Sequence, residues 1–458
     1  MPDKKADAVE WLSEATDSEI AEAGFRLADM YFQGHGRPKN TEKAFEWYLK
    51  AAEKGHPEAQ LRLGEILLNG TIHTKSYTEA FKWFEKAAVN GMARAQYRLA
   101  QMYLQGIGVP QSYEKAAAYY EQACALGIAD AMSELSQMYF DGTGVRRDIP
   151  KGLELCEQAA ELGVADAQRL LAELYFEGTV VEQNYNTAHK WFGEAAVQGD
   201  VRAQIRLAEM HYAGVGVQRD LRQASEWYKK AVDKESPEAM FELAVMYLHG
   251  EGVSQDVPRA VQLLTEAAKQ NVPGAQARLG LLYLSGEGVT ENLKKAFNYL
   301  RQAAEQGVPE AQQELANLYQ TGRAVPKNSK LAFHWYHKAA DNGIAEAQER
   351  IAYYYLSGRS GPRSIDQALK YYTLAAEQGR RESQEKLGAI YAEGIGTACD
   401  LVEAHKWFSI AGTGDSEPAL EARRERDRVA SRMTATQLTQ AQRNALAWWE
   451  RRHNGNGA

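Results

Sequence analysis

The sequence predicts an all-α fold: a right-handed α/α solenoid of eleven 36-residue helix-turn-helix repeats with capping helices. Three observations lead to this prediction. Small residues recur every 36 residues, apolar residues follow a helical period within each interval, and each interval holds one glycine stop and one polar helix start. The opening residue, here called position 0 of each repeat, is alanine in ten repeats and serine in the last: residues 23, 59, 95, 131, 167, 203, 239, 275, 311, 347 and 383.

The first helix of each repeat is predicted from apolar residues at positions 0, 4, 7, 8 and 11, as in Ala59, Leu63, Ile66 and Leu67. This spacing places them on one helix face. Position 4 is leucine in every repeat except one, which has Ile351, so it belongs to the core. A glycine at position 11 of every repeat predicts the end of the helix, because glycine adopts the left-handed conformation at little cost.

The second helix is predicted to begin six residues after this glycine, at a residue whose side chain can cap a helix N-terminus. It carries an aromatic pair in most repeats, such as Trp47–Tyr48, and an alanine at position 28 of every repeat, from Ala51 to Ala411. The alanine indicates that backbones approach closely there. One such hairpin cannot bury its own apolar face, so stacking of neighbouring repeats must supply the core.

The repeat pattern resembles the Sel1-like repeat, a relative of the tetratricopeptide repeat. Alanine and leucine four apart, a Y-x-x-G-x-G-V turn and a capped K-A-x-x-W/Y-Y/F-x-x-A-A-x-x-G helix all match, as in RLGLLYLSGEGVTENLKKAFNYLRQAAEQG (278–307). The resemblance extends over residues 20–415. It implies a solenoid that binds proteins, in a bacterial adaptor or regulator. It departs from the pattern where Glu235, Asn271 and Asp415 replace the closing glycine.

Both ends of the chain differ from a full repeat. Residues 8–15 match the second half of a repeat, and residues 1–19 are expected to form an N-terminal capping helix, or else to follow an upstream segment. After Asp415 the pattern stops, with Arg423 where leucine is needed and Ala430 where glycine is needed. Residues 416–458 are expected to form C-terminal capping helices and a short disordered tail, with a capping box at 434–437.

Composition excludes several classes of protein. The chain is 45% hydrophobic and 25% charged, with a net charge of -8, which argues against a nucleic-acid-binding surface. It has no long uncharged apolar run, so no transmembrane segment is predicted. The first twenty residues lack the apolar stretch of a signal peptide, so a cytoplasmic location is expected, or a periplasmic one if a targeting segment precedes them. The oligomeric state stays open.

No catalytic residue, cofactor or metal site is predicted. The chain has no phosphate-binding loop, nucleophile elbow, HExxH or CxxC motif. His334 and His337 could ligate a metal, but no neighbouring acidic or cysteine partner repeats with them, so no site is expected there. His211 is expected to be a hydrogen-bonded core imidazole. The three cysteines (Cys124, Cys156 and Cys399) are expected to be reduced and mostly buried.

One enzymatic alternative comes from the resemblance. Some Sel1-like proteins form a cysteine-rich secreted group credited with penicillin binding or β-lactam hydrolysis. Cys124 lies where that group has half of a disulfide, but the partner position is Met132, so the bridge cannot form here.

A second apolar stripe runs along the first helices at positions 2 and 9, away from the predicted core face. It is either packing between neighbouring first helices or the lining of a concave groove for a partner segment. It fades after the eighth repeat, to residues such as Gln313, Glu349 and Glu385. The residues singled out for partner binding are Phe25, Phe32, Leu61, Leu68, Tyr97, Leu104, Phe140, Ile205, Tyr212, Phe241 and Leu248.

Position 3 is basic in seven repeats. Arg26, Arg62 and Arg206 are expected to pair with acidic residues three positions later on the same helix. Arg98, Arg278 and Arg350 have no such partner and are the predicted contacts for a partner's carboxylates.

The sequence therefore predicts a non-enzymatic scaffold that binds one or more proteins or peptide segments on its concave face. The resemblance implies a role in envelope assembly, exopolysaccharide control, signalling or virulence. Two alternatives stay open: a β-lactam- or peptidoglycan-handling enzyme or glycan-binding protein, and a structural subunit that docks through its end caps.

Overall fold

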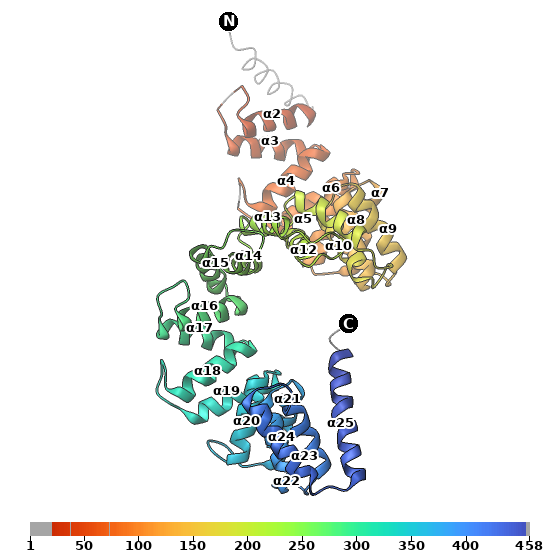
Figure 1. The fold of residues 1–458 in the computed structure, drawn as a ribbon. Coiled ribbons are helices and arrows are strands. Elements are labelled where there is room, and N and C mark those ends of the chain that lie inside the picture. The colour runs from red at the N-terminus through yellow and green to blue at the C-terminus, as the bar shows by residue number, and fades with distance from the viewer. Residues whose placement is uncertain (1–20, 37, 73, 455–458) are drawn as a thin grey trace. The chain divides into compact units, whose positions relative to one another are not determined.

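The computed structural model describes residues 21–36, 38–72 and 74–454 (Figure 1). Every regular element in these residues is an α-helix, so the predicted all-α solenoid is confirmed. The chain forms two compact units that meet at Lys234 and Glu235, and each unit is considered by itself below. The predicted capping helix over 1–19 and the last four residues, 455–458, lie outside the described residues.

The first unit contains six helical hairpins, which are the first six repeats. Within each hairpin the two helices pack against each other, and each second helix except the last packs on the first helix of the next repeat. Its helices are α2 (Ala21–Gln33), α3 (Thr41–Glu53), α4 (Pro57–Asn69), α5 (Tyr77–Val89), α6 (Ala93–Gln105), α7 (Tyr113–Ala125), α8 (Ala129–Asp141), α9 (Ile149–Glu161), α10 (Ala165–Glu177), α11 (Tyr185–Val197), α12 (Val201–Ala213) and α13 (Leu221–Val232).

The second unit contains the other five repeats and two further helices. Its helices are α14 (Pro237–His249), α15 (Val257–Lys269), α16 (Pro273–Ser285), α17 (Leu293–Glu305), α18 (Pro309–Thr321), α19 (Ser329–Asp341), α20 (Ala345–Ser357), α21 (Ile365–Glu377), α22 (Arg381–Glu393), α23 (Leu401–Ala411), α24 (Glu417–Ala430) and α25 (Ala435–Asn454).

The predicted helix ends are confirmed in both units. The glycine at position 11 has a left-handed backbone in every repeat, as at Gly70 with a φ of 67°. The polar residue six positions later caps the second helix: the Asn40 side chain accepts a hydrogen bond from the Lys43 backbone N–H at 2.9 Å. Ser76 alone among these capping residues makes no side-chain bond of this kind.

The two helices of a repeat come closest at positions 5 and 25. Position 5 is always alanine, glycine or serine and is buried, and position 25 carries a buried side chain that is usually large. A Cβ atom added to Gly64 would lie 2.6 Å from the Phe84 ring, and one on Gly280 would lie 2.6 Å from Leu300 Cγ. A side chain at position 5 of these repeats would therefore push the two helices apart.

A buried glutamine at position 1 ties neighbouring repeats together, and sequence periodicity did not reveal it. In α18, Gln312 Nε2 donates to the Ala304 carbonyl of the preceding repeat at 3.2 Å, and its Oε1 accepts from Asn342 Nδ2 at 2.9 Å. The amide thus joins α17, α18 and α19. The same pair of bonds is made by Gln60, Gln168, Gln276 and Gln348.

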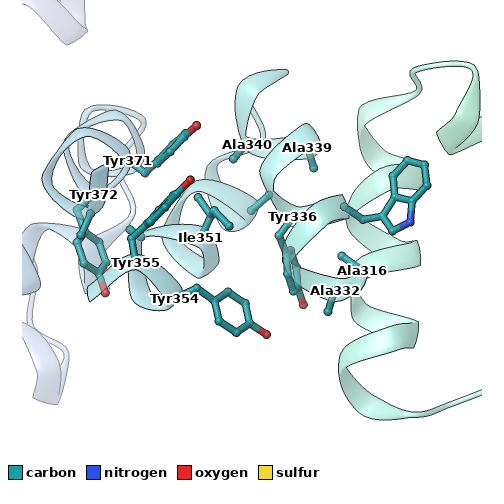
Figure 2. Packing of buried hydrophobic residues seen from close by; sticks show 14 of the residues in the cluster. Ala316, Ala332, Tyr336, Ala339, Ala340, Ile351, Tyr354, Tyr355, Tyr371 and Tyr372 are labelled. Carbon is teal, nitrogen blue, oxygen red and sulfur yellow. The ribbon is translucent and has the colours of Figure 1, made fainter. Parts of the chain in front are cut away.

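Aromatic rings also bridge successive repeats. At three junctions an aromatic ring at position 22 of one repeat packs edge-on against a ring at position 8 of the next, as Phe333 does against Tyr355 with 5.4 Å between centroids. Figure 2 shows the core of this region, where the Tyr355 and Tyr371 rings lie nearly parallel with centroids 6.0 Å apart. Side-chain contact of this kind continues the core from one hairpin to the next.

The 36-residue spacing continues one helix beyond the point where the sequence pattern stops. Ala419 in α24 follows Ser383 by 36 residues and is completely buried, like the opening alanine of a repeat. Arg423, at the expected leucine position, instead donates from Nε to the Gly412 carbonyl at 2.7 Å. Helix α25 packs on α23 through Ala441, Ala445 and Trp448.

The predicted capping box at the start of α25 is confirmed. The Thr434 backbone N–H donates to Gln437 Oε1 at 2.9 Å, and the Gln437 N–H donates to Thr434 Oγ1 at 3.3 Å. The two side chains therefore satisfy backbone donors at the helix start.

Replacing Gln312 with alanine should lower the free energy of unfolding of the second unit by about 1–3 kcal/mol, because the buried Ala304 carbonyl loses its side-chain donor and Asn342 its acceptor. Urea denaturation followed by circular dichroism measures the change. Gln302→Ala, at an exposed side chain of α17 without a side-chain hydrogen bond, is the matched control and should stay within about 0.5 kcal/mol of the wild type. Equal effects of the two variants would contradict this role of Gln312.

Candidate functional site

None of the eleven apolar stripe residues proposed for partner binding is an exposed side chain in the structure. Leu61, Phe140 and Ile205 are buried. The others are half-buried: Phe25, Phe32, Leu68, Tyr97, Leu104, Tyr212, Phe241 and Leu248.

Side chains at position 2 reach the start of the next repeat's first helix. The Phe25 ring stacks on His56 with 4.7 Å between centroids, and Arg169 Nε lies 3.3 Å from Asp200 Oδ2. Phe241 fills the space beside Gly274, where an added Cβ would lie 2.9 Å from the ring. Position 2 is therefore a contact between first helices of neighbouring repeats.

Side chains at position 9 contact the second helix of their own repeat, and the Phe176 ring also lies 5.9 Å from the Arg206 guanidinium of the next repeat. A Cβ on Gly152 of α9 would lie 2.8 Å from the Phe140 ring, and Phe176 of α10 contacts Tyr185 of α11 with 5.2 Å between centroids. The two halves of the stripe thus have different packing partners. Their use as a binding groove stays a prediction.

The arginines at position 3 divide into paired and unpaired side chains. Arg62 and Arg206 lie 3.4 Å and 2.9 Å from the acids three residues later, as expected. Arg26 instead pairs with Glu22 at 2.6 Å, because Asp29 accepts a hydrogen bond from the Tyr48 hydroxyl. Arg98 donates to Gln101 Oε1 at 2.9 Å.

Arg278 and Arg350 make neither an ion pair nor a side-chain hydrogen bond within the described part of the chain. Of the three arginines predicted to bind a partner's carboxylates, these two have a guanidinium without a protein partner.

In the first unit, a polar cleft of about 370 Å³ opens across the first helices of repeats 4, 5 and 6. It lies where Ser133 and Arg169 interrupt the apolar stripe at position 2. Its walls come from α8, α10 and α12. The lining residues are Ser133, Glu134, Gln137, Asp166, Arg169, Leu170, Glu173 and Arg202.

Arg169 is fixed at the centre of the cleft by three carboxylates. Its guanidinium lies 3.4 Å from Asp166, 2.9 Å from Glu173 and 3.3 Å from Asp200. Partial burial acts to lower the pKa of Arg169, but these carboxylates outweigh it and raise the pKa. A side chain held from three sides is preorganised, so it forms a rigid floor rather than a mobile contact.

Three other lining side chains have polar groups left over. Ser133, Glu134 and Arg202 make no side-chain hydrogen bond or ion pair with any described residue. Loss of hydration, together with repulsion from Asp166 and Asp130, raises the pKa of Glu134. The cleft therefore offers one carboxyl and one guanidinium that a ligand could engage.

The comparisons with known proteins agree with this repeat architecture. The Sel1 repeat model matches the chain eleven times: residues 21–56, 57–91, 93–128, 129–164, 165–200, 201–236, 237–272, 273–308, 309–344, 345–379 and 381–416. The chain belongs to the Sel1-repeat family. Sel1-repeat solenoids are commonly protein-interaction scaffolds.

Two solved Sel1-repeat structures are similar to this chain. A protective antigen of uropathogenic Escherichia coli strains with the same fold is 31% identical and has a TM-score of 0.86. The alignment covers 96% of this chain and 94% of the antigen. A Sel1 repeat protein from Oxalobacter formigenes is 29% identical, covers 67% of this chain over 88% of its own, and has a TM-score of 0.50. The comparison with curated proteins finds no match.

Other candidate chemistry is sparse in the described residues of this Sel1-repeat protein. They hold no helix long and apolar enough to span a bilayer, and no group of three histidine, cysteine or acidic side chains placed to bind a metal. Burial raises the pKa of the Cys124 and Cys156 thiols to about 12, so both are protonated at neutral pH. Contrary to the expectation of mostly buried thiols, only Cys156 is buried, and Cys399 is exposed.

In the second unit, two glutamates at position 2 have opposite pKa shifts. Burial acts to raise the pKa of Glu349, but hydrogen bonds from Arg380 at 2.7 Å and Ser383 at 2.9 Å outweigh it and lower the pKa. Glu385 has a buried Oε1 without a hydrogen-bond partner, and burial, aided by Glu421, raises its pKa.

These shifts predict opposite effects of neutral substitutions. Because the pKa of Glu349 is lowered in the fold, its ionised form stabilises the protein above the ordinary pKa of 4.5, and this stabilisation is lost as the pH falls. Because the pKa of Glu385 is raised, its ionised form destabilises the protein, and protonation at low pH removes that cost. At pH 7, Glu349→Gln should lower the free energy of unfolding by about 1–3 kcal/mol, and Glu385→Gln should leave it unchanged or raise it. Urea denaturation at pH 7 and pH 4 measures both. A cost of Glu349→Gln that does not shrink at pH 4 would contradict the assignment.

Proposed function

We propose that this protein is a non-enzymatic scaffold that binds a segment of a partner protein across the first helices of repeats 4 to 6. The observation that carries the proposal is the cleft over α8, α10 and α12, whose lining includes a carboxyl and a guanidinium without protein partners. Both side chains are exposed, so their charges are available to pair with opposite charges of a partner at a preorganised cleft.

The charges suggest the chemistry of the partner segment. Glu134 and the neighbouring acids favour a basic side chain, and Arg202 favours a carboxylate, so the segment carries both charges a few residues apart. A lysine or arginine of the segment would lie beside Glu134, and an aspartate or glutamate beside Arg202. In the second unit, the unpaired Arg278 and Arg350 are further contacts for acidic residues of a partner.

This role accords with the family, whose solenoids commonly act as protein-interaction scaffolds. We place the protein among bacterial regulatory or assembly factors. The similar protein from uropathogenic Escherichia coli is a protective antigen, which supports a bacterial setting but does not name a partner.

The test is capture of partners from a bacterial lysate by the purified full chain, followed by mass spectrometry and by affinity measurement with the purified partner. The variant Glu134→Gln/Arg202→Gln removes both unpaired charges of the cleft without changing net charge. It should weaken binding by about tenfold, because each lost contact between exposed charges is worth about 0.2–1 kcal/mol and about 1.4 kcal/mol is a factor of ten. Circular dichroism should show unchanged helicity, since neither side chain is buried.

The matched control is Glu194→Gln/Arg222→Gln. Both residues are exposed on second helices of the same unit, and neither makes an ion pair with a described residue. This variant should bind like the wild type. Equal affinity of the cleft variant and the control would contradict the proposed surface.

The alternative to binding at the cleft is docking of a partner at the C-terminal end of the chain. Substitution of one exposed side chain there tests this alternative. Deletion of 416–458 would uncover Phe408, which packs with Val429 of α24, so it would confuse folding with binding. Leu446→Ser changes an exposed leucine of α25 instead. Loss of binding in this variant, with the cleft variant unaffected, would favour end docking.

A further inference from the structure

At the junction of repeats 5 and 6, two histidines stand where three other junctions have an aromatic pair. Position 22 of one repeat and position 8 of the next are Phe81 and Tyr103 with 5.5 Å between centroids, and Phe297 and Tyr319 with 5.8 Å. Here they are His189 of α11 and His211 of α12, whose rings keep the edge-on arrangement at 5.2 Å and 80°. Among the described repeats, both members of the pair are histidine at this one junction.

The two rings present nitrogen atoms to each other at a distance that suits a shared ligand. His189 Nε2 and His211 Nε2 are 3.3 Å apart. Two imidazole nitrogens that each lie about 2.0–2.1 Å from one ion at a tetrahedral angle are about 3.3–3.4 Å apart. An ion could therefore bind both nitrogens without separation of α11 and α12.

Both imidazoles are suited to act as neutral ligands. Burial lowers the pKa of His189, with His211 adding to the effect, and burial also lowers the pKa of His211 against the opposing charge of Asp220. His211 Nδ1 is buried and has no hydrogen-bond partner, so Nε2 is the nitrogen of that ring that meets another group. Neutral imidazole is the form that binds metals.

The surroundings of the two histidines leave room for water ligands. No lysine lies over the His211 ring from the place that it takes in repeats 3 and 4. In repeats 3 and 4 the ring at position 8 has a lysine over it, as Lys151 lies over Tyr139 at 4.4 Å, whereas repeat 6 has the neutral Gln223 at that place. Position 26 of repeat 3 holds Glu121, which accepts from the Tyr139 hydroxyl at 2.7 Å. Repeat 5 has Gly193 there, and an added Cβ would meet no atom within 4 Å.

We propose that His189 and His211 together bind one late first-row divalent metal ion, such as Zn²⁺ or Cu²⁺, with water completing its coordination. Imidazole is a common ligand of these ions. The other closely spaced histidines, His334 and His337, are less suited. His337 Nδ1 lies 2.9 Å from Asp341, and its Nε2 lies 3.4 Å from the Tyr371 hydroxyl. The bound ion would clamp repeat 5 to repeat 6.

The test is titration of the full chain with Zn²⁺ at pH 7.5 by calorimetry, together with thermal unfolding with and without the ion. The wild type should bind one ion at this site and unfold at higher temperature in its presence, because the ion binds the folded state. His189→Phe and His211→Tyr should each weaken binding by about tenfold or more. The double variant restores the phenylalanine–tyrosine pair of other junctions, so it should fold normally and lose the stabilisation by Zn²⁺.

A control variant and a spectroscopic measurement test whether the ion binds at these two histidines. His334→Gln/His337→Gln should leave Zn²⁺ binding unchanged. Electron paramagnetic resonance of the wild type with one equivalent of Cu²⁺ should show coupling to two imidazole nitrogens, a result that needs no variant. Equal Zn²⁺ affinity of wild type and the His189→Phe/His211→Tyr variant, no binding by the wild type, or a Cu²⁺ spectrum without imidazole coupling would overturn the proposal.

Discussion

The close approach of the two helices within each repeat is the constraint on which the rest of the structure depends. A small residue at position 5 faces a buried, usually large side chain at position 25, as Gly64 faces Phe84. Because close-packed interiors leave no spare volume, this pair fixes the separation of the helices. The fixed hairpin then presents the same surface to each neighbour, which allows a 36-residue spacing without insertions.

Polar groups then join one hairpin to the next within each unit. The side-chain amide of a glutamine such as Gln312 donates to a backbone carbonyl of the preceding repeat and accepts from a side chain of its own repeat. Both polar atoms of the buried amide are therefore hydrogen-bonded. In the repeats that contain Gln96 and Gln204, the residue at position 31 has no side-chain amide that could donate to the glutamine. Each of these two glutamines keeps a buried Oε1 without a hydrogen-bond partner. Leu126 and Lys234 stand at that position in their repeats. The junctions are therefore similar in backbone and unequal in polar contacts.

Two departures from the repeat pattern lie close together in the first unit. Ser133 and Arg169 break the apolar stripe in repeats 4 and 5, and His189 and His211 replace an aromatic pair at the next junction. A repeat scaffold tolerates such changes because each repeat contacts only its neighbours, so one junction can carry a site without loss of the fold. The cleft and the histidine pair are the two places where these departures leave polar groups with unused binding capacity.

The sequence by itself determined the helical repeat, its period, its glycine stops and most of its caps, because these depend on local backbone preference and on apolar spacing along one helix. It also singled out Arg278 and Arg350, since a missing intrahelical partner can be read from neighbouring residues. Only the tertiary structure decided that Phe25 and Phe241 contact the next repeat, that Gln312 joins three helices, and that His189 meets His211. Apart from the bond between Gln312 and the Ala304 carbonyl, these contacts link residues about 20 to 35 positions apart, whose side chains meet only once the hairpins have stacked.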